Sequence, residues 1–302
     1  MCLTLQQTTQ DLCSPITCIT TQRCIINREY QALLEQHQLG SFEALFRFQG
    51  GEAAKTIRER SVTRFEVEAG GAKTTFYLKR HKLSFVGIKR LLALFFPNTL
   101  VSEGIKEFKS ICDFRASKLA TVVPVAAGEK FVNFFWVESF LLTEDFSPFI
   151  QLEDLVTAQP AFFKGREGRS VRQRLLKEIA VFAQRMHARG FNHRDFNTTH
   201  ILVKYNAADH RPELAVFDLQ RVDKARLFRF RWMIKSLARV NYSLPDHLFT
   251  AKDIIYLFMS YKGKNAMNFM DRCQWFWIRR KTGKIRKHTE KIMRAAIKQS
   301  EP

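Results

Sequence analysis

The sequence lacks the patterns typical of a zinc-stabilised, secreted or membrane-spanning protein. Its 6 cysteines form no C-x-x-C pair, and four of them precede residue 25, so neither a structural zinc site nor a disulfide framework is indicated. No uncharged apolar run reaches the roughly 18 residues of a transmembrane helix. The start, MCLTLQQTTQDLC, has no basic stretch followed by an apolar one, so no signal peptide is predicted. We therefore expect free thiols and a cytoplasmic protein.

Acidic residues are scarce relative to basic ones. Lys plus Arg number 49 against 29 for Asp plus Glu, which gives a net charge of +20. Such a charge favours an anionic partner, either nucleic acid, an anionic membrane surface or a phosphorylated substrate. No run of basic and aromatic residues typical of single-strand binding occurs, and no finger or recognition-helix motif stands out, so nucleic acid is disfavoured.

The chain is long enough for one large domain or two lobes, since it has 302 residues of which 46% are hydrophobic. Residues 1–27 show no clear periodicity and are predicted to be a poorly ordered extension. Residues 28–146 read as short helices, a hairpin turning at Gly70 and Gly71, a helix over 102–119 and two further strands. Residues 147–302 read as mainly helical, with two short strands at 200–206 and 213–220. A helix is expected to start at Ser170, with Gln173 completing a capping box, and to end before Gly190. The fold class is therefore α+β.

The stretch GFNHRDFNTTHILV at 190–203 follows this helix and precedes a short strand. The next strand ends in VFDLQ. This order resembles the bilobal protein-kinase core, which implies that Asp195 orients the attacking hydroxyl and that Asp218 holds magnesium. Outside a kinase core, Asp195 would be an ordinary carboxylate in a turn. Arg221 could then form an ion pair with Asp218 in place of a metal.

The same resemblance implies roles for residues in the first half of the chain. Lys79 in FYLKR would hold the phosphates of ATP, paired with Glu107, or with Glu103 one turn earlier. Glu144 and Asp145 in TEDF would lie in the hinge, where the backbone meets adenine. Lys79 also has a simpler interpretation, because a basic edge strand is a common defence against sheet pairing.

The ordered set TRFEVE, FYLKRH, EFKSI, SFLLTEDF, MHARGFNHRDFNTTHILV, VFDLQRV, KSLARVNYSL and DIIYLFMSYKG resembles the lipopolysaccharide core kinase family, particularly its heptose-kinase branch. The resemblance spans roughly residues 28–265. It implies an ATP- and Mg²⁺-dependent kinase of an inner-core sugar, acting on a lipid A glycolipid at the cytoplasmic face of the inner membrane of a Gram-negative bacterium.

Departures from ordinary protein kinases leave alternatives open. No G-x-G-x-x-G loop occurs, and the matching turn, TIRERSVTRF, offers Arg58, Arg60 or Ser61 as phosphate contacts. His200 replaces the catalytic-loop asparagine, so it is either a second metal ligand or a satisfied core histidine. A degenerate pseudokinase, a kinase of another small molecule, or a basic membrane- or nucleic-acid-binding protein therefore remain alternatives.

Two segments fit attachment to a membrane surface. Residues 279–298 are strongly basic, and the stretch SFVGIKRLLALFFP at 84–97 mixes apolar residues with Lys89 and Arg90. A solvated helix is the plain interpretation of the first segment. If the protein is a kinase of a membrane glycolipid, binding of these basic residues to anionic lipid headgroups is the better interpretation.

Overall fold

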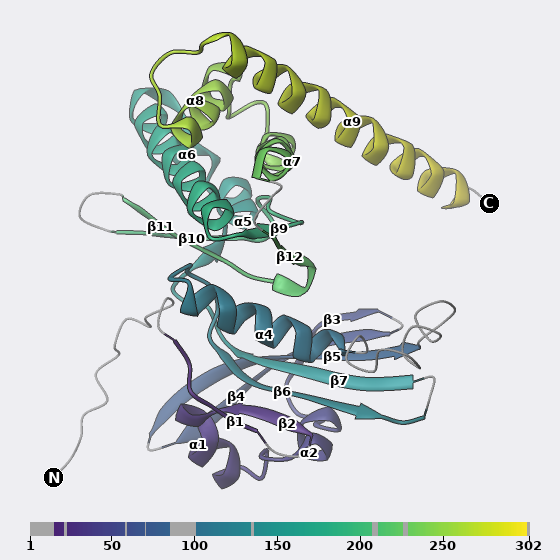
Figure 1. Ribbon diagram of the computed structural model, residues 1–302. Coiled ribbons are helices and arrows are strands. Elements are labelled where there is room, and N and C mark those ends of the chain that lie inside the picture. The colour runs from purple at the N-terminus through teal and green to yellow at the C-terminus, as the bar shows by residue number, and fades with distance from the viewer. Residues whose placement is uncertain are drawn as a thin grey trace, which may run out of the picture. The chain divides into compact units, whose positions relative to one another are not determined.

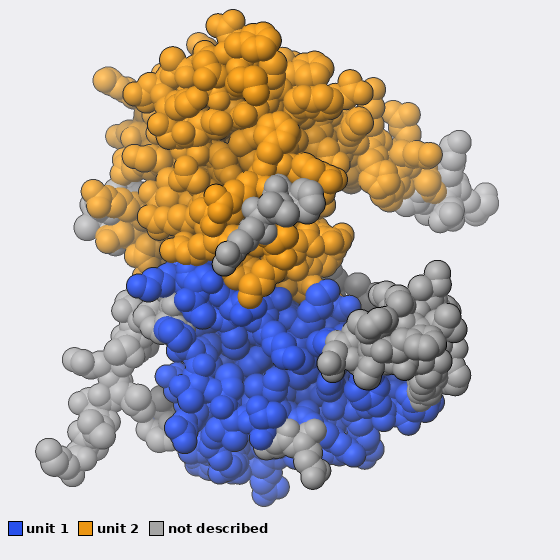
Figure 2. Space-filling view, viewed as in Figure 1, with its two compact units in different colours: residues 1–146 blue, residues 147–302 orange. Residues whose placement is uncertain are grey.

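The computed structural model describes residues 15–20, 23–57, 59–69, 71–84, 101–133, 136–206, 211–225 and 229–300. The chain divides into two compact units, residues 1–146 and 147–302, coloured separately in Figure 2. Arg58 and the segment 85–97, which the sequence singled out, lie outside the described residues.

Unit 1 is built on a seven-stranded sheet with the order β1-β2-β6-β7-β5-β4-β3. All its neighbouring strands pair antiparallel. Its strands are β1 (Cys18–Thr20), β2 (Cys24–Asn27), β3 (Glu52–Ile57), β4 (Arg60–Ala69), β5 (Ala72–Ser84), β6 (Pro124–Phe131) and β7 (Trp136–Glu144). Its helices are the 3₁₀ turn η1 (Arg28–Tyr30), α1 (Gln31–Gln36), α2 (Phe42–Phe46) and α4 (Glu103–Ala116).

Helices cover both faces of this sheet (Figure 1). On one face, α1 and α2 contribute Leu34, Phe42 and Leu45 to a core that includes Phe76 and Phe140 from the strands. The opposite face carries α4, whose buried side chains recur at Ile105, Phe108, Ile111 and Phe114. This spacing places them on one side of the helix, toward the sheet.

The expectation of a poorly ordered segment up to residue 27 is wrong for β1 and β2. β2 pairs with β6, with Cys24 opposite Gly128 and Ile26 opposite Ala126. Cys24 and Ile26 are buried in the core while Ile25 between them is half-buried. This alternation is a strand pattern, but it is too short to be recognised without its partner.

Unit 2 is mainly helical. Its helices are α5 (Leu152–Ala158), η3 (Pro160–Phe163), α6 (Gly165–Ala188), η4 (Leu219–Arg221), α7 (Arg229–Ser243), α8 (Ala251–Lys262) and α9 (Phe269–Ser300). Its strands are β8 (Ile150–Gln151), β9 (Phe191–His193), β10 (Ile201–Tyr205), β11 (Pro212–Val216) and β12 (Val222–Lys224). β8, β10 and β11 form one small sheet, and β9 pairs with β12. α6 packs against α8 and α7, and α9 packs against α7 (Figure 1).

The long helix α6 begins earlier than the capping-box pattern predicted. It starts at Gly165, which has a positive φ of 71°, so Ser170 and Gln173 lie within the helix. The predicted end is confirmed, because Arg189 is the C-cap and Gly190 follows with φ 83°. A left-handed glycine after the last turn is a common helix stop, and here it delivers the chain directly into β9.

Candidate active site

The predicted catalytic loop and the DLQ loop are held together at the ends of one hairpin. β10 and β11 pair from Ile201–Val216 to Tyr205–Pro212, so the residues before β10 and after β11 share one end. β9 and β12 add a second ladder in which His193 lies opposite Val222. Two strand pairings therefore fix Asp195 and Asp218 within the same rigid frame.

His193 fastens the two loops from the inside. Its Nε2–H donates to the carbonyl oxygen of Phe217 at 3.1 Å, and its Nδ1 accepts from the backbone N–H of Asp195 at 3.2 Å. Burial lowers the pKa of His193 to about 4, so the ring is neutral at physiological pH and can accept at Nδ1. The neutral His193 therefore holds the two loops together by hydrogen bonding.

Asp195 lies between two arginines. Arg239, on α7, donates from Nη1 to Oδ1 at 2.6 Å, and Arg221, on η4, donates from Nη1 to both carboxylate oxygens at 3.1 and 3.2 Å. Charge-assisted hydrogen bonds of this kind are among the strongest in proteins and restrict the rotation of the carboxylate. The sequence did not reveal Arg239, and it suggested Arg221 as a partner for Asp218, whereas the structure places Arg221 on Asp195.

Arg194 of the HRD motif is bound elsewhere. Its guanidinium contacts both carboxylate oxygens of Asp223 on β12, at distances from 2.6 to 3.0 Å. The guanidinium lowers the pKa of Asp223, and the carboxylate raises that of Arg194. Asn192 also donates to Asp223, at 3.0 Å. This ion pair joins β9 to β12 and leaves Arg194 with a structural role.

Asp218 has an uncommon backbone conformation. Its φ and ψ are 58° and 59°, the left-handed region that few residues other than glycine adopt. Such conformations concentrate at functional sites, where the surrounding structure holds them in place. Here the hairpin ladder before Asp218 and β12 after η4 supply that support.

His200 directs one ring nitrogen toward Asp218. Its Nε2 lies 3.7 Å from Oδ2 of Asp218, while its Nδ1 lies 3.0 Å from Oδ1 of Asn197. The described residues contain no cluster of three His, Cys, Asp or Glu side chains able to hold a metal by themselves. Mg²⁺ usually binds through one or two carboxylates, completing its shell with phosphates and water, so Asp218 fits it. The imidazole of His200 is a poorer donor for this ion.

In unit 1, Lys79 pairs with Glu107. The Lys79 Nζ donates to Oε1 of Glu107 at 2.8 Å, and the two side chains are 12% and 1% exposed. Lys79 lies on β5, opposite Val62 of β4 and Leu141 of β7. The interpretation of Lys79 as a basic residue on an edge strand is therefore wrong, and the pairing selects Glu107 over Glu103.

The other predicted nucleotide contacts fall at the ends of strands. Arg60 and Ser61 begin β4, opposite His81 and Arg80 of β5. Glu144 ends β7 and accepts from the Tyr30 hydroxyl at 2.6 Å. The backbone N–H groups of Glu144 and Asp145 donate to Val123 and Thr75 within the same unit. Adenine contacts in this segment therefore cannot use those two donors.

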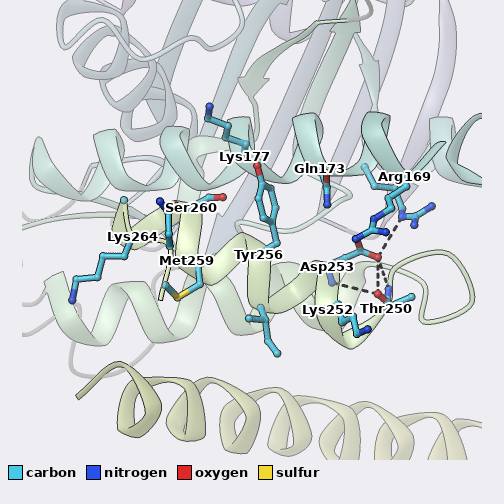
Figure 3. Close-up of a pocket in the computed structure, with 14 residues that line it drawn as sticks. Arg169, Gln173, Lys177, Thr250, Lys252, Asp253, Tyr256, Met259, Ser260 and Lys264 are labelled. Carbon is cyan, nitrogen blue, oxygen red and sulfur yellow. Dashed lines mark hydrogen bonds and ion pairs between the residues drawn. The ribbon is translucent and has the colours of Figure 1, made fainter. Parts of the chain in front are cut away.

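A cavity of about 700 Å³ lies between α6 and α8 (Figure 3). Its walls include Arg169, Lys177 and Lys252, and Arg172 pairs with Asp253 there at 3.3 Å. The carboxylate of Asp253 also completes a capping box with Thr250. None of the predicted site residues lines it, so it is separate from the candidate active site.

Comparison with known proteins identifies the family. The model of the lipopolysaccharide kinase (Kdo/WaaP) family matches residues 46–261, more than half of the chain. A lipopolysaccharide core heptose(I) kinase WaaP of Escherichia coli is 30% identical over 211 residues, covering 68% of this chain and 75% of that protein. WaaP of Pseudomonas aeruginosa is 29% identical over 226 residues, covering 73% and 80%.

A solved structure described as WaaP in complex with acyl carrier protein shares the fold. Its TM-score is 0.64 at 22% identity, and the match covers 87% of this chain and 98% of that one. The predicted α+β, kinase-like fold class is confirmed, with a sheet-rich first half and a helical second half. From the family match over residues 46–261, the chain belongs to the lipopolysaccharide kinase (Kdo/WaaP) family.

Proposed function

We propose that this protein transfers the terminal phosphoryl group of ATP to a hydroxyl of a heptose in the inner core of lipopolysaccharide. The observation that carries the proposal is the frame around Asp195 and Asp218, which two strand pairings and the buried His193 hold together. Phosphoryl transfer depends mainly on positioning and on balancing charge, so a rigid pair of carboxylates is the feature it requires.

In this proposal each residue of the frame has a definite task. Asp195 accepts a hydrogen bond from the sugar hydroxyl and orients its oxygen toward the phosphorus. Arg221 and Arg239 keep the carboxylate oriented, and they add positive charge where negative charge develops in the transition state. Asp218 supplies a carboxylate to the Mg²⁺ that accompanies ATP, and His200 adjoins that carboxylate.

Unit 1 supplies the nucleotide contacts. Lys79 would bind the phosphates, and Glu107, buried beneath it, keeps its ammonium oriented. Arg60 and Ser61 replace the missing glycine loop as phosphate contacts, and the segment at Glu144 and Asp145 meets adenine. The interaction of Lys79 with Glu107 also accounts for a nearly fully buried carboxylate, which would be costly without a cationic partner.

The second half of α9 supports attachment to an anionic membrane surface. Ile292, Met293 and Ile297 are 54 to 61% exposed and share one side of the helix, and Arg286, Lys287, Lys291 and Arg294 are exposed in the same part of α9. An amphipathic basic helix of this kind suits the boundary between headgroups and acyl chains. None of the described helices combines the length and apolar character needed to cross a bilayer.

The test is phosphoryl transfer from labelled ATP to core lipopolysaccharide that has first been dephosphorylated. Wild type is expected to label a heptose in the presence of Mg²⁺. Asp195→Asn is expected to lower turnover by about 100- to 10,000-fold, the range for losing a positioned base. Near-normal turnover in that variant would show that Asp195 does not orient the attacking hydroxyl. Magnesium-dependent ATP binding without transfer to any saccharide would instead indicate a pseudokinase.

A further inference from the structure

Three basic side chains follow one another along a single face of α7. Arg231, Lys235 and Arg239 are spaced by four residues, so each lies about one turn, roughly 6 Å, from the next. The last of them, Arg239, contacts Asp195 at 2.6 Å. This row of cations therefore leads along the helix to the predicted catalytic carboxylate.

α9 faces this row with cations of its own. A cavity of about 220 Å³ between the two helices is lined, mainly by apolar atoms, by Arg231, Ile234 and Lys235 from α7 and by Trp277, Arg280, Lys281 and Lys284 from α9. A second cavity of about 310 Å³ shares Arg231 and Lys235 and extends to Asp223 and Lys224 on β12. We call these two adjoining cavities, which share Arg231 and Lys235, the α7–α9 groove.

The positive charge of the α7–α9 groove is not balanced from within. Asp223 is the one carboxylate among the described residues that line it. Arg194 and Asn192 already bind that carboxylate. Burial lowers the pKa of Lys235, and the neighbouring charges of Arg231 and Lys281 lower it further. Like charges held this close destabilise one another until an anion joins them.

Packing prevents the helices from separating to relieve this repulsion. Ile278 of α9 is fully buried. Thr282, one turn later, accepts from Asn241 at 3.1 Å, and its Oγ1 lies 3.3 Å from the carbonyl oxygen of Ala238, both on α7. The backbone positions from which the cations project are consequently fixed before any ligand arrives, so an anion that binds there need not bring the two helices together.

We propose that the α7–α9 groove binds an anionic substituent of the acceptor, a phosphate or carboxylate carried by the same glycolipid as the reacting hydroxyl. This inference rests on the proposed function and adds to it a basis for acceptor recognition. Lys235 and Arg231 lie about one and two turns from Arg239, roughly 6 and 12 Å along the helix. The groove therefore selects acceptors whose charge lies one or two sugar units from the hydroxyl that Asp195 orients.

The experiment compares two double variants that remove the same charge from different cavities of unit 2. Lys235→Gln with Lys281→Gln removes two positive charges from the α7–α9 groove. Lys177→Gln with Lys252→Gln removes two from the cavity between α6 and α8 (Figure 3). All four lysines lie at the protein surface, Lys281 being partly buried. Thermal unfolding would confirm that both variants are folded.

The acceptor is deacylated core oligosaccharide, used with its lipid A phosphates intact and after their enzymatic removal. For the intact acceptor, the groove variant is expected to raise KM roughly tenfold or more, since each lost charge-assisted bond weakens binding severalfold. Its KM for ATP, and the acceptor KM of the control variant, should stay at the wild-type values. Phosphate removal should raise the wild-type KM and leave that of the groove variant nearly unchanged. If phosphate removal is without effect while the groove variant is weakened, the groove binds a carboxylate of the acceptor instead of a phosphate.

An unchanged acceptor KM in the groove variant, or an equal rise in the control, would overturn the inference. Calorimetric binding of the same oligosaccharide without nucleotide separates this inference from the proposed function. If wild type binds the oligosaccharide and the groove variant does not, the groove is supported even where no phosphate is transferred. If both bind equally, the groove has no role in recognising the acceptor.

Discussion

At the scale of single residues, the arginine contacts of Asp195 make the sharpest prediction. Replacing Arg239 with Ala removes the 2.6 Å contact to Oδ1. Asp195 can then rotate away from the sugar hydroxyl, and a misplacement of about 1 Å is worth on the order of a hundredfold in rate. We expect kcat for phosphoryl transfer to fall by roughly ten- to a hundredfold, with partial recovery in Arg239→Lys.

The control for this experiment is Arg23→Ala. Arg23 pairs with Glu43 on the exposed surface of unit 1, so its loss should leave kcat unchanged. Equal rates in Arg239→Ala and wild type would show that Arg221 alone suffices to orient Asp195.

A second residue-scale prediction concerns the buried His187 on α6. Its Nδ1 lies 2.8 Å from the Tyr261 hydroxyl and its Nε2 lies 3.2 Å from Oγ of Ser236. Burial lowers its pKa to about 4 from 6.5. Between pH 6.5 and pH 4, His187 therefore binds a proton in the unfolded chain but not in the folded one. The free energy of unfolding consequently falls as the pH drops through this range. The expected slope is about 1.4 kcal/mol per pH unit from this group.

Urea unfolding at pH 7 and pH 5 measures that slope. His187→Gln is expected to reduce it, although His193, whose pKa is also about 4, should retain its own share. His247 is exposed, so His247→Gln serves as the matched control. An identical slope in all three proteins would mean that His187 does not resist protonation.

At the scale of elements, the close packing of α4 against the sheet depends on Gly104. A Cβ built at Gly104 would overlap the backbone carbonyl of Phe140 on β7. Gly104→Ala must therefore push α4 away from the strand, and with it Glu107 and its contact with Lys79. Overpacking of this kind costs about 1–3 kcal/mol, which should appear as a lower midpoint of thermal unfolding.

A glycine in α9 provides the opposite case. Nothing lies within 4 Å of a Cβ built at Gly283, so Gly283→Ala should gain up to about 1 kcal/mol from helix propensity. Opposite shifts in the two variants are expected. A neutral or stabilising Gly104→Ala would show that α4 can move without loss.

At the scale of the whole molecule, the proposed membrane attachment combines the charge of +20 with the exposed apolar residues in the second half of α9. We expect sedimentation with vesicles containing anionic phospholipid, and none with zwitterionic vesicles. Raising the salt from 0.1 to 0.5 M should weaken binding, because the screening length is only about 10 Å at 0.1 M. Ile292→Ser with Met293→Ser should weaken it about tenfold or more, through lost burial of apolar surface.

A matched pair of exposed apolar residues lies at the end of β6 and just beyond it. Phe131 and Val132 are 49 and 54% exposed, and their replacement by Ser should leave vesicle binding intact. If that variant lost vesicle binding while the α9 variant kept it, the membrane contact would lie in unit 1 instead of in α9.

Sequence alone determined the features that depend on neighbours along the chain. Helical spacing marked α4, and alternation with a glycine turn marked the β4–β5 hairpin, because these periods follow from local backbone geometry. The order of HRD, hairpin and DLQ indicated a kinase core, and that class is now established through the family. The capping box at Ser170 failed because Gly165 starts the helix a turn and a half earlier.

Only the tertiary structure decided which distant side chains meet. Arg239 lies 44 residues from Asp195, and nothing in the local pattern of α7 distinguishes it from the other basic residues there. The choice of Glu107 over Glu103, the place of β2 beside β6 and the meeting of α7 with α9 likewise join segments far apart in sequence. Such contacts are set by how whole elements pack, and packing depends on shape and burial that no short stretch of sequence contains.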